Sequence, residues 1–535
     1  MLEVVDRGLF LTPLWWWLTA PQVTLLHHVH SSATEQDGLR ARIGARAQRL
    51  MIRLFYGHHA FITLTEQDAL ELEGLGVPRD SIHVASTGSK LLPVLEKTAD
   101  EERSRLRDAL RQSQTGAAAG LAVATLTNNA IQLLFTIIFA KLLGASGYGA
   151  LAALISVFLI MMVVGQSVQV AAAREATLGA LGDDARQRLT MRRWAQTLVI
   201  ATIVLFVVCG LARGPLSELF GVPEHPWAAA AVFPTGALWL LLSLQRGLLQ
   251  GLRAYAAVGY SLIGEAGGRV MVGLILVAFG TGVTGAFLGT PLAFALTSAA
   301  LVFVLNKRLG PSVDTTAKTT PLRNLVRDNR LPIFGLLMLA LLQNIDVIIA
   351  RHEFTGDTPG AYAAAAVAAK AVVWVAIGVG LQVLPEAARR AADGDDPRPV
   401  LLRSLAVLAV VAIPAVTIFA LIPRLLLQVV FGEEFTLASG ALPLLGLAMT
   451  FLAIAYLTVQ YLVALGEMRF IWILVPLAVI EPVVLLKANF AGGSELTSYA
   501  WIVLAVQAVA ATLIFLLGMK TKERHGGAPP EPLPI

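Results

Sequence analysis

Residues 128–158 read NNAIQLLFTIIFAKLLGASGYGALAALISVF, and this stretch decides the fold class. Two apolar runs flank Lys141 and a glycine-rich segment, which predicts a chain that crosses an apolar medium, turns and crosses it again. About 20 apolar residues span the hydrocarbon core of a bilayer. Of the 535 residues, 56% are hydrophobic and 14% are charged, whereas a soluble domain carries about 25% charged residues. A soluble fold cannot bury that much apolar surface, so the sequence predicts an integral membrane protein.

Apolar segments of spanning length recur through the chain after residue 117. They predict twelve spans, at 118–140, 149–171, 194–212, 227–249, 256–280, 284–306, 331–350, 360–388, 402–422, 440–464, 468–489 and 498–518. Lys and Arg in alternate connections number 21 on one side and 5 on the other. Cytoplasmic loops carry the excess of basic residues, so both termini are predicted to be cytoplasmic. The basic pI of about 9.4 follows this topology and indicates no nucleic-acid partner.

An internal repeat relates the two halves of the membrane part. Lys141 with its following glycines is echoed at Arg351, Phe220-Gly221 at Phe431-Gly432, and Gly251 at Gly466, with offsets of 210, 211 and 215 residues. Six spans separate equivalent points, so both copies have the same orientation. Parallel repeats of this kind are related by an axis along the membrane normal and place a substrate site between them.

The predicted fold is therefore an all-α polytopic membrane protein of twelve transmembrane helices in two parallel six-helix lobes, preceded by a small partial α/β cytoplasmic segment. Three short β-rich runs, at 23–28, 60–64 and 81–85, alternate with helical patterns at 39–56 and 66–73 and predict that segment. The predicted divisions are an α/β segment (1–92), a charged helical linker (93–117), an N-lobe (118–310), a cytoplasmic loop (311–330), a C-lobe (331–518) and a disordered tail (519–535).

Ionisable residues inside the spans mark the expected site, because each costs about 2.5–3.5 kcal/mol in lipid and usually faces a cavity. The predicted substrate-binding cations are Arg269, Lys370, Arg246 and Arg174. The predicted ion-coupling carboxylates are Asp346, Glu265 and Glu481. Glu265 and Arg269 lie four apart on one helical face and can pair. For Arg174, Arg246 and Glu386, the alternative is a side chain that extends to the cytoplasmic interface.

A cavity lined by these cations would attract phosphate or diphosphate through charge-assisted hydrogen bonds. The carboxylates would instead bind Na⁺ or a proton and couple transport to an ion gradient. No catalytic residue, metal ligand or cofactor is expected, and the chain has no GxxxxGK[ST] sequence for ATP. Cys209 is the one cysteine and can form no internal disulfide.

Residues 128–158 resemble the opening of polysaccharide flippases of the multidrug/oligosaccharidyl-lipid/polysaccharide exporter superfamily, as do the segments 246–255, 279–293 and 343–370. The resemblance runs over residues 118–518. It implies a bundle of two six-helix lobes that moves an undecaprenyl-diphosphate-linked oligosaccharide from the inner to the outer leaflet by alternating access, for surface polysaccharide biosynthesis. Among the family's cavity cations, it carries over to Arg269 and Lys370.

That family implies a bacterial cytoplasmic membrane, with membrane lipids, a polysaccharide polymerase and glycosyltransferases as further partners. The alternative is an ion-coupled small-molecule exporter of the same superfamily. A third hypothesis is a membrane-anchored glycosyltransferase, because residues 58–88 are similar to the end of the acceptor half of GT-B glycosyltransferases. The segment departs from that family: Thr87 stands where Asn is usual before Gly88, and the nucleotide-sugar-binding half is missing. His28 and His30 are its candidate contacts, but the fragment is expected to be incomplete and inactive.

Overall fold

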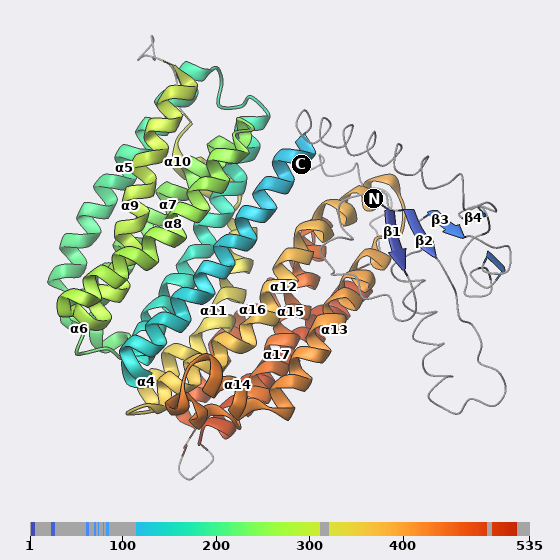
Figure 1. Ribbon diagram of the computed structural model, residues 1–535. Coiled ribbons are helices and arrows are strands. Elements are labelled where there is room, and N and C mark those ends of the chain that lie inside the picture. The colour runs from blue at the N-terminus through green and yellow to red at the C-terminus, as the bar shows by residue number, and fades with distance from the viewer. Residues whose placement is uncertain are drawn as a thin grey trace, which may run out of the picture. The chain divides into compact units, whose positions relative to one another are not determined.

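The computed structural model of the protein describes residues 2–5, 23–26, 60–63, 69–70, 73, 79, 82–84, 114–310, 320–488, 490 and 495–521. The chain divides into two compact units, residues 1–117 and 118–535. The first unit holds short strands and the second is built from long helices (Figure 1).

Four parallel strands form the sheet of the first unit, in the order β1-β2-β3-β4. They are β1 (Leu2–Val5), β2 (Val23–Leu26), β3 (Ala60–Thr63) and β4 (Ile82–Val84). The last three lie within the three β-rich runs of the sequence, and β1 was not predicted. The predicted helix at 39–56, with His28, His30, Thr87 and Gly88, lies outside the described residues, as do most of the linker and the tail.

Long helices make up the N-lobe, residues 118–310. They are α4 (Gln114–Thr177), α5 (Asp184–Leu211), α6 (Arg213–Leu219), α7 (Pro226–Gly251), α8 (Tyr255–Leu276), the π-helical turn η3 (Val277–Thr281) and α9 (Gly282–Leu309). The short α10 (Leu322–Asp328) follows. Asp183 caps α5 by accepting a hydrogen bond from the Arg186 backbone N–H at 3.1 Å, which satisfies one of the free donors at a helix start.

The C-lobe, residues 331–518, repeats this plan. Its helices are α11 (Arg330–Glu353), α12 (Thr358–Asp393), α13 (Arg398–Leu421), α14 (Pro423–Val430), the 3₁₀ turn η4 (Glu433–Ala438), α15 (Leu442–Ala464), α16 (Ile471–Lys487) and α17 (Glu495–Lys520). The short helices α6 and α14 occupy corresponding places, since they follow α5 and α13, which contain the third predicted span of each lobe. The structure is that of an all-α polytopic membrane protein, as the sequence predicted.

Nine stretches among the described residues are long and apolar enough to cross a membrane. Two of them, Val123–Thr177 and Tyr255–Leu309, are 55 residues long, or about 80 Å of helix, far more than the roughly 30 Å of a bilayer core. Each folds back at a glycine with positive φ, Gly144 (φ 67) and Gly280 (φ 81), where any other residue would be strained. Helix α16, with 17 residues, is short for a span. Twelve spans remain a prediction, and the lengths of these helices are compatible with it.

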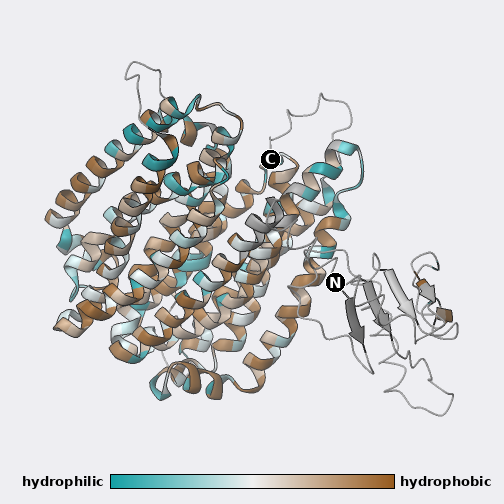
Figure 2. Cartoon of the chain, turned by 45° about the horizontal axis from the view of Figure 1, so that its top comes forward, coloured by the Kyte–Doolittle hydropathy of each residue, from teal (hydrophilic) through white to brown (hydrophobic). Residues whose placement is uncertain are grey.

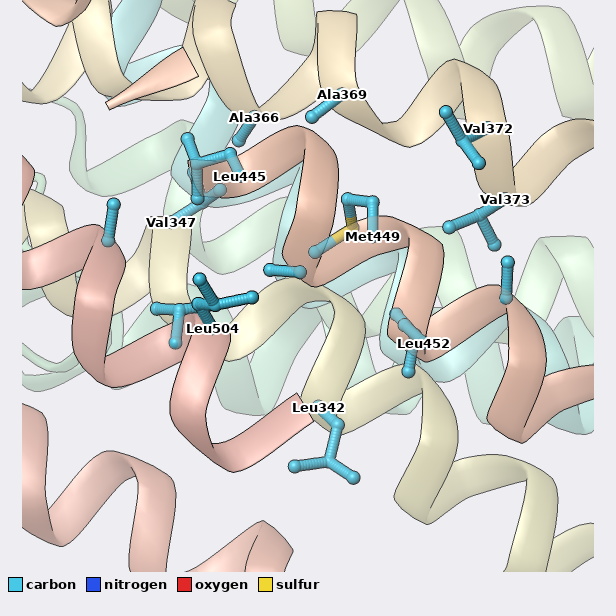
Figure 3. Close-up of a cluster of buried hydrophobic side chains, with 14 of the residues drawn as sticks. Leu342, Val347, Ala366, Ala369, Val372, Val373, Leu445, Met449, Leu452 and Leu504 are labelled. Carbon is cyan, nitrogen blue, oxygen red and sulfur yellow. The ribbon is translucent and has the colours of Figure 1, made fainter. Parts of the chain in front are cut away.

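The helix surfaces are apolar along most of their length, and hydrophilic residues gather mainly near the helix ends (Figure 2). Within each lobe the apolar faces pack into a core. Part of the C-lobe core, between α11, α12, α15 and α17, is drawn in Figure 3, where Leu342, Val347, Met449 and Leu504 are among the buried side chains. Extensive packing among α5–α9 and among α11–α17 stays within each lobe. Leu325 of α10 and Ile333 of the first turn of α11 join the N-lobe core.

At one end of the bundle the two lobes contact each other through residues 141–149, 212–226, 351–363 and 422–441. The charge distribution predicts that this end lies outside, and we call it the outer end. Arg351 donates a hydrogen bond from Nε to the Gly221 carbonyl at 3.0 Å, and its Nη2 lies 3.4 Å from a Glu224 carboxylate oxygen. His352 Nε2 lies 2.8 Å from the Leu219 carbonyl oxygen. This set of contacts, from Arg351 and His352 to residues 219–224, is called the outer latch below.

The repeat makes this contact reciprocal. Arg351 is the counterpart of Lys141, and Phe220-Gly221 is the counterpart of Phe431-Gly432. On the other half of the interface, Tyr148 packs edge-on against Phe435, with ring centroids 5.9 Å apart. Between the two halves, a Cβ on Gly149 would lie 2.9 Å from the Gly360 backbone nitrogen, so only glycine fits. The turn near each copy's first span thus meets the turn after the other copy's third span, as a two-fold axis between parallel repeats requires.

Candidate functional site

The first cluster of buried polar side chains lies in the N-lobe, between α7 and α8. Arg246 is fully buried and forms an ion pair with Glu265 at 2.8 Å. It also donates to the hydroxyl and the carbonyl oxygen of Ser261, each at 2.9 Å, and lies over the Trp239 ring at 5.7 Å. A buried guanidinium needs such partners because its desolvation is otherwise uncompensated. The pair is internally neutral and holds α7 against α8.

Arg269 lies one turn beyond Glu265 on α8 but faces α4. It is 6% exposed, donates from Nη1 to Gln132 Oε1 at 3.1 Å, and stacks over Phe135 at 4.4 Å. No carboxylate lies within ion-pair distance of it among the described residues, and its Nε has no hydrogen-bond partner there. Arg174, half-buried at the inner end of α4, also has an Nε without a partner among the described residues. These two arginines therefore keep donors available.

The second cluster lies in the C-lobe core. Lys370 of α12 donates to the Asn344 amide oxygen at 3.0 Å. Asp346 accepts from the Tyr362 hydroxyl at 2.7 Å, and its backbone carbonyl accepts from the Tyr499 hydroxyl at 2.7 Å. Four helices, α11, α12, α16 and α17, contribute to this C-lobe cluster, which consists of Asn344, Asp346, Tyr362, Lys370, Glu481, Tyr499 and Gln507.

Glu481 and Gln507 complete the C-lobe cluster on α16 and α17. Gln507 donates to the Leu342 carbonyl at 2.8 Å and reaches a Glu481 carboxylate oxygen at 3.5 Å. Both are fully buried, as is Asp346. One oxygen of each of these three side chains, Asp346 Oδ1, Glu481 Oε1 and Gln507 Oε1, has no hydrogen-bond donor among the described residues. Because a buried acceptor without a donor is costly, the C-lobe cluster is short of positive charge or protons.

The structure changes two expectations about individual residues. Glu265 pairs with Arg246 of α7 and not with Arg269, because the fully buried Arg246 sits directly across the helix interface while Arg269 turns toward α4. Arg246 also does not extend to the interface, since it is fully buried. Glu386 does reach the surface, where its half-exposed carboxylate pairs with Arg389 and Arg390. Hydrogen bonds from Arg389 and Arg390 lower its pKa.

The predicted site residues fall into two separate groups. Arg246, Glu265 and Arg269 lie in N-lobe helices, and Asp346, Lys370 and Glu481 lie in C-lobe helices. A shared cationic cavity for Arg269 and Lys370 therefore remains a prediction. Sequence reasoning missed Gln132, Tyr362, Tyr499 and Gln507. The signal for them was polar side chains at spanning depth, which were passed over because they carry no charge.

No group of three or more His, Cys, Asp or Glu that could hold a metal ion occurs in the part of the chain that the structure describes. The C-lobe cluster has two carboxylates among amide and hydroxyl groups.

A model of the polysaccharide biosynthesis protein family matches residues 117–384, which is half of the chain and includes both clusters except α16 and α17. The chain belongs to this family. No curated protein matches it significantly. The family match covers the whole N-lobe and the first two long helices of the C-lobe, so the outer latch lies inside it.

Solved structures share the fold of this polysaccharide biosynthesis family member. The inward-facing conformation of a multidrug resistance MATE family transporter of the MOP superfamily has a TM-score of 0.61 at 13% identity, over 75% of this chain and 97% of that one. The eukaryotic MATE transporter AtDTX14 has a TM-score of 0.54 at 14% identity, over 75% and 94%. A MOP superfamily transporter from Pyrococcus furiosus, whose binding pocket has reversed polarity, has a TM-score of 0.50 at 16% identity, over 77% and 96%. The family member thus has the fold of a MOP-type transporter and is a multi-pass membrane protein.

Proposed function

We propose that this protein moves an undecaprenyl-diphosphate-linked oligosaccharide across the bacterial cytoplasmic membrane, for cell-surface polysaccharide biosynthesis. The observation that carries the proposal is the match to the polysaccharide biosynthesis protein family on a transporter fold. A family that serves polysaccharide synthesis through a transporter needs a glycan cargo, and a lipid carrier supplies the membrane-bound form of it. Both termini then lie in the cytoplasm, with a polymerase and glycosyltransferases as neighbours in the pathway.

Two lobes joined at the outer end support an alternating-access mechanism. The outer latch closes the lobes on that side through three contacts from Arg351 and His352. Opening it and closing the inner ends would expose a substrate site between the lobes to the other leaflet. The glycines at the centre of the interface, Gly149 and Gly360, allow the backbones to approach closely in the latched state.

Arg269 and Arg174 are the residues we propose for the diphosphate headgroup. Each has an Nε without a partner among the described residues, and a guanidinium binds phosphate oxygens through charge-assisted hydrogen bonds. Arg246 also has a guanidinium nitrogen, Nη1, without a partner among the described residues, but its charge is neutralised by Glu265. Lys370 donates to Asn344 within the C-lobe cluster. Of the four predicted cations, we therefore propose only Arg269 and Arg174 as ligands of the diphosphate headgroup.

The test is reconstitution of the full chain in vesicles that carry a fluorescent lipid-diphosphate oligosaccharide, with transfer between leaflets followed by quenching from outside. Arg269→Gln keeps a polar side chain but removes the charge, and we expect at least about a tenfold loss of rate, as for one charge-assisted contact. Arg192→Gln, at an exposed position on α5, is the matched control and should transport normally. Wild-type protein that leaves the lipid in its original leaflet would refute the function.

The second candidate is a small-molecule exporter of the same superfamily, which the multidrug transporters among the similar structures favour. A pocket for cationic drugs would require unpaired carboxylates near the substrate. The buried N-lobe carboxylate Glu265 is paired with Arg246, whereas Asp346 and Glu481 of the C-lobe cluster each keep a carboxylate oxygen without a donor among the described residues. Uptake of a fluorescent cationic dye into the same vesicles separates the two functions. Dye transport without lipid transfer would favour the exporter.

A further inference from the structure

A row of uncharged polar side chains runs along the first half of α4, where the sequence predicts the first span. Its members are Thr125, Asn129, Gln132 and Thr136. Their spacings of four, three and four residues place them on one face of the helix. From the first to the last they cover about 16 Å of helix. We call this face the polar stripe of α4.

The faces on either side of the polar stripe are apolar. On one side, Phe135 and Phe139 are at most 3% exposed and belong to the N-lobe core. On the other side, Leu126 and Leu133 are 61% and 39% exposed, as expected for side chains that contact lipid. The members of the stripe itself are exposed or half-buried. The first half of α4 therefore presents a core face, a polar face and an apolar outer face.

The two amides of the stripe keep hydrogen-bond donors without partners. Asn129 Oδ1 accepts from Asn128 Nδ2 at 3.4 Å, and Gln132 Oε1 accepts from Arg269 Nη1 at 3.1 Å. Each amide also carries two N–H donors, and those of Asn129 and Gln132 have no partner in the described part of the chain. The neighbouring Asn128, 8% exposed, has an Oδ1 that accepts from no donor there. Such groups are unfavourable in lipid, so the stripe faces water or a polar ligand.

The stripe lies on a helix at the border between the two lobes. In Figure 1 the first half of α4, drawn in cyan, runs along the side of the N-lobe toward the C-lobe. Within the N-lobe it contacts α8, where Arg269 lies over Phe135. At its outer end the helix reverses at Gly144, and the turn reaches the C-lobe, where the Ala145 carbonyl lies against Gly360. Parallel repeats place a substrate between them, which is the side on which this helix lies.

The internal repeat does not account for the stripe. The residues 210 positions later are Gly335, Leu339, Leu342 and Asp346, and the two leucines belong to the C-lobe core. The second copy therefore forms the same kind of helix without these hydroxyl and amide groups. Because the fold does not require them, a function specific to the N-lobe is the better explanation.

The chemistry of the stripe selects among ligands. A hard cation takes about six or more oxygen ligands at once, whereas these side chains are spread along about 16 Å of helix. A cationic drug would bind carboxylates or aromatic faces, and the stripe has neither. Amides and hydroxyls both donate and accept hydrogen bonds. The hydroxyl groups of a sugar ring do the same, so an uncharged sugar is the matching ligand.

We propose that the polar stripe of α4 binds uncharged sugar residues of the lipid-linked oligosaccharide through hydrogen bonds to their hydroxyl groups. Gln132 contacts Arg269, the cation proposed for the diphosphate, and the first sugar of such a lipid is attached to that diphosphate. The sugar site and the diphosphate site must therefore adjoin, as Gln132 and Arg269 do. Asn129 and Thr125, farther toward the inner end of α4, bind the sugars that follow. The assignment rests on the proposed function, because it names the part of that substrate which the stripe recognises.

The first test measures equilibrium binding of radiolabelled lipids to the full-length protein in lipid nanodiscs by scintillation proximity. The probes are undecaprenyl diphosphate that carries a disaccharide of N-acetylglucosamine, and bare undecaprenyl diphosphate. Asn129→Leu should lower the affinity for the sugar-bearing lipid about three- to tenfold, as for the loss of one or two hydrogen bonds. It should leave the affinity for the bare lipid unchanged, which also shows that the variant is folded. Arg269→Gln should weaken both.

Thr125→Val and Thr127→Val form a matched pair of variants. Both hydroxyls donate to the carbonyl four residues earlier, at 2.9 and 3.0 Å, and both changes keep the shape of the side chain. Thr127 lies about 200° around the helix from Thr125 and so outside the stripe. Thr125→Val should lower the affinity for the sugar-bearing lipid about two- to fivefold, and Thr127→Val should bind both lipids as the wild type does.

The second test asks whether the stripe is in contact with water and covered by sugar. Asn129→Cys and Leu133→Cys are made in a Cys209→Ala background, which removes the native thiol. A membrane-impermeant thiol reagent should label the Asn129→Cys protein and leave the Leu133→Cys protein, on the apolar outer face, largely unlabelled. The sugar-bearing lipid should slow the labelling of Asn129→Cys at least about threefold more than the bare lipid.

The outcomes separate this assignment from the proposed function. An Asn129→Leu variant that loses affinity for both lipids equally, equal effects of Thr125→Val and Thr127→Val, or an Asn129→Cys protein that resists labelling overturns the assignment. Transfer of the sugar-bearing lipid by the same proteins would leave the proposed function intact. Binding that depends on the stripe in a protein that transfers no lipid would refute transport and support the stripe. A wild-type protein that binds neither lipid overturns both.

Discussion

The Arg246–Glu265 pair offers the sharpest test of how the N-lobe is held together. Both side chains are at most 5% exposed, and the pair is joined at 2.8 Å, with two further hydrogen bonds from Arg246 to Ser261. Replacing one partner leaves the other charge buried without compensation, which costs about 3–5 kcal/mol of stability. Arg246→Met and Glu265→Leu are each expected to lower stability by that amount.

The double variant Arg246→Met/Glu265→Leu should behave differently. It removes both charges and replaces them with apolar side chains of similar volume, a change that is often neutral or stabilising for a buried pair. The Ser261 hydroxyl still donates to the Val258 carbonyl at 2.7 Å, so its loss of Arg246 leaves no buried donor unpaired. We therefore expect the double variant to cost less than either single variant, at most about 2 kcal/mol.

The assay is reversible unfolding of the purified protein in mixed micelles, followed by helical circular dichroism, for the wild type, both single variants and the double variant. The coupling free energy from this cycle should exceed about 2 kcal/mol in favour of the pair. Single variants that cost under about 1 kcal/mol, or a double variant whose cost equals the sum of the two, would refute the assignment. A double variant that is stable but transfers no lipid would indicate that Arg246 takes part in binding the headgroup.

Three further predictions concern other contacts. Gly360→Ala should favour separated lobes, because a Cβ there would collide with the Ala145 carbonyl; the distance between spin labels on Glu218→Cys and Thr355→Cys, on opposite sides of the outer latch in a Cys209→Ala background, measures this. Gly378→Ala on the same helix meets nothing within contact distance and should be neutral or stabilising. His225 has a lowered pKa because burial disfavours its charged form, so stability should be full above about pH 6.5 and fall as the pH drops below that value; His225→Gln should flatten the pH profile of the unfolding midpoint. Trp194→Phe removes the indole donor to the Thr320 carbonyl at 2.8 Å and should cost about 1 kcal/mol in the micelle unfolding assay; an unchanged midpoint would show that this contact contributes nothing.

The long-range features of the fold could be predicted from the sequence because they depend on the composition and length of the apolar segments. Apolar runs and the glycine-rich segment at 144–149 predicted a chain that reverses direction, and the structure reverses at Gly144. The second reversal, at residues 277–282, falls at the predicted gap between 280 and 284. A positive φ at glycine has a local cause, so the signal lies within a few residues of its effect.

The partners of the buried charged side chains could not be predicted from the sequence in this way. Glu265 and Arg269 have the spacing of an intrahelical pair, yet Glu265 binds Arg246, nineteen residues earlier on another helix. The choice depends on how α7 and α8 are rotated against each other, which no local spacing records. Gln507 likewise reaches Leu342 and Glu481 from the last helix. Sequence patterns give the depth of a charged residue in the membrane but not the neighbour that compensates it.

The internal repeat links a pattern in the sequence to a contact between the two lobes. Its echoes at Lys141 and Arg351, and at Phe220 and Phe431, were visible as weak similarities, and the structure turns them into a reciprocal contact between the lobes. Symmetry explains why both copies keep glycines at this interface, since each must accept the other's turn at close range. It does not explain Asn344 and Asp346 of the C-lobe cluster, since the residues 210 positions earlier are Leu134 and Thr136. Glu481, in contrast, has a counterpart in Glu265, because each follows the arginine of its copy, Arg469 or Arg253, by twelve residues. The two lobes therefore share a buried glutamate at equivalent places and differ in its partner: Glu265 forms an ion pair with Arg246, whereas Glu481 has only the long contact from Gln507 among the described residues. Symmetry of the fold thus fixes where a buried charge lies, and the sequence of each copy fixes how it is compensated.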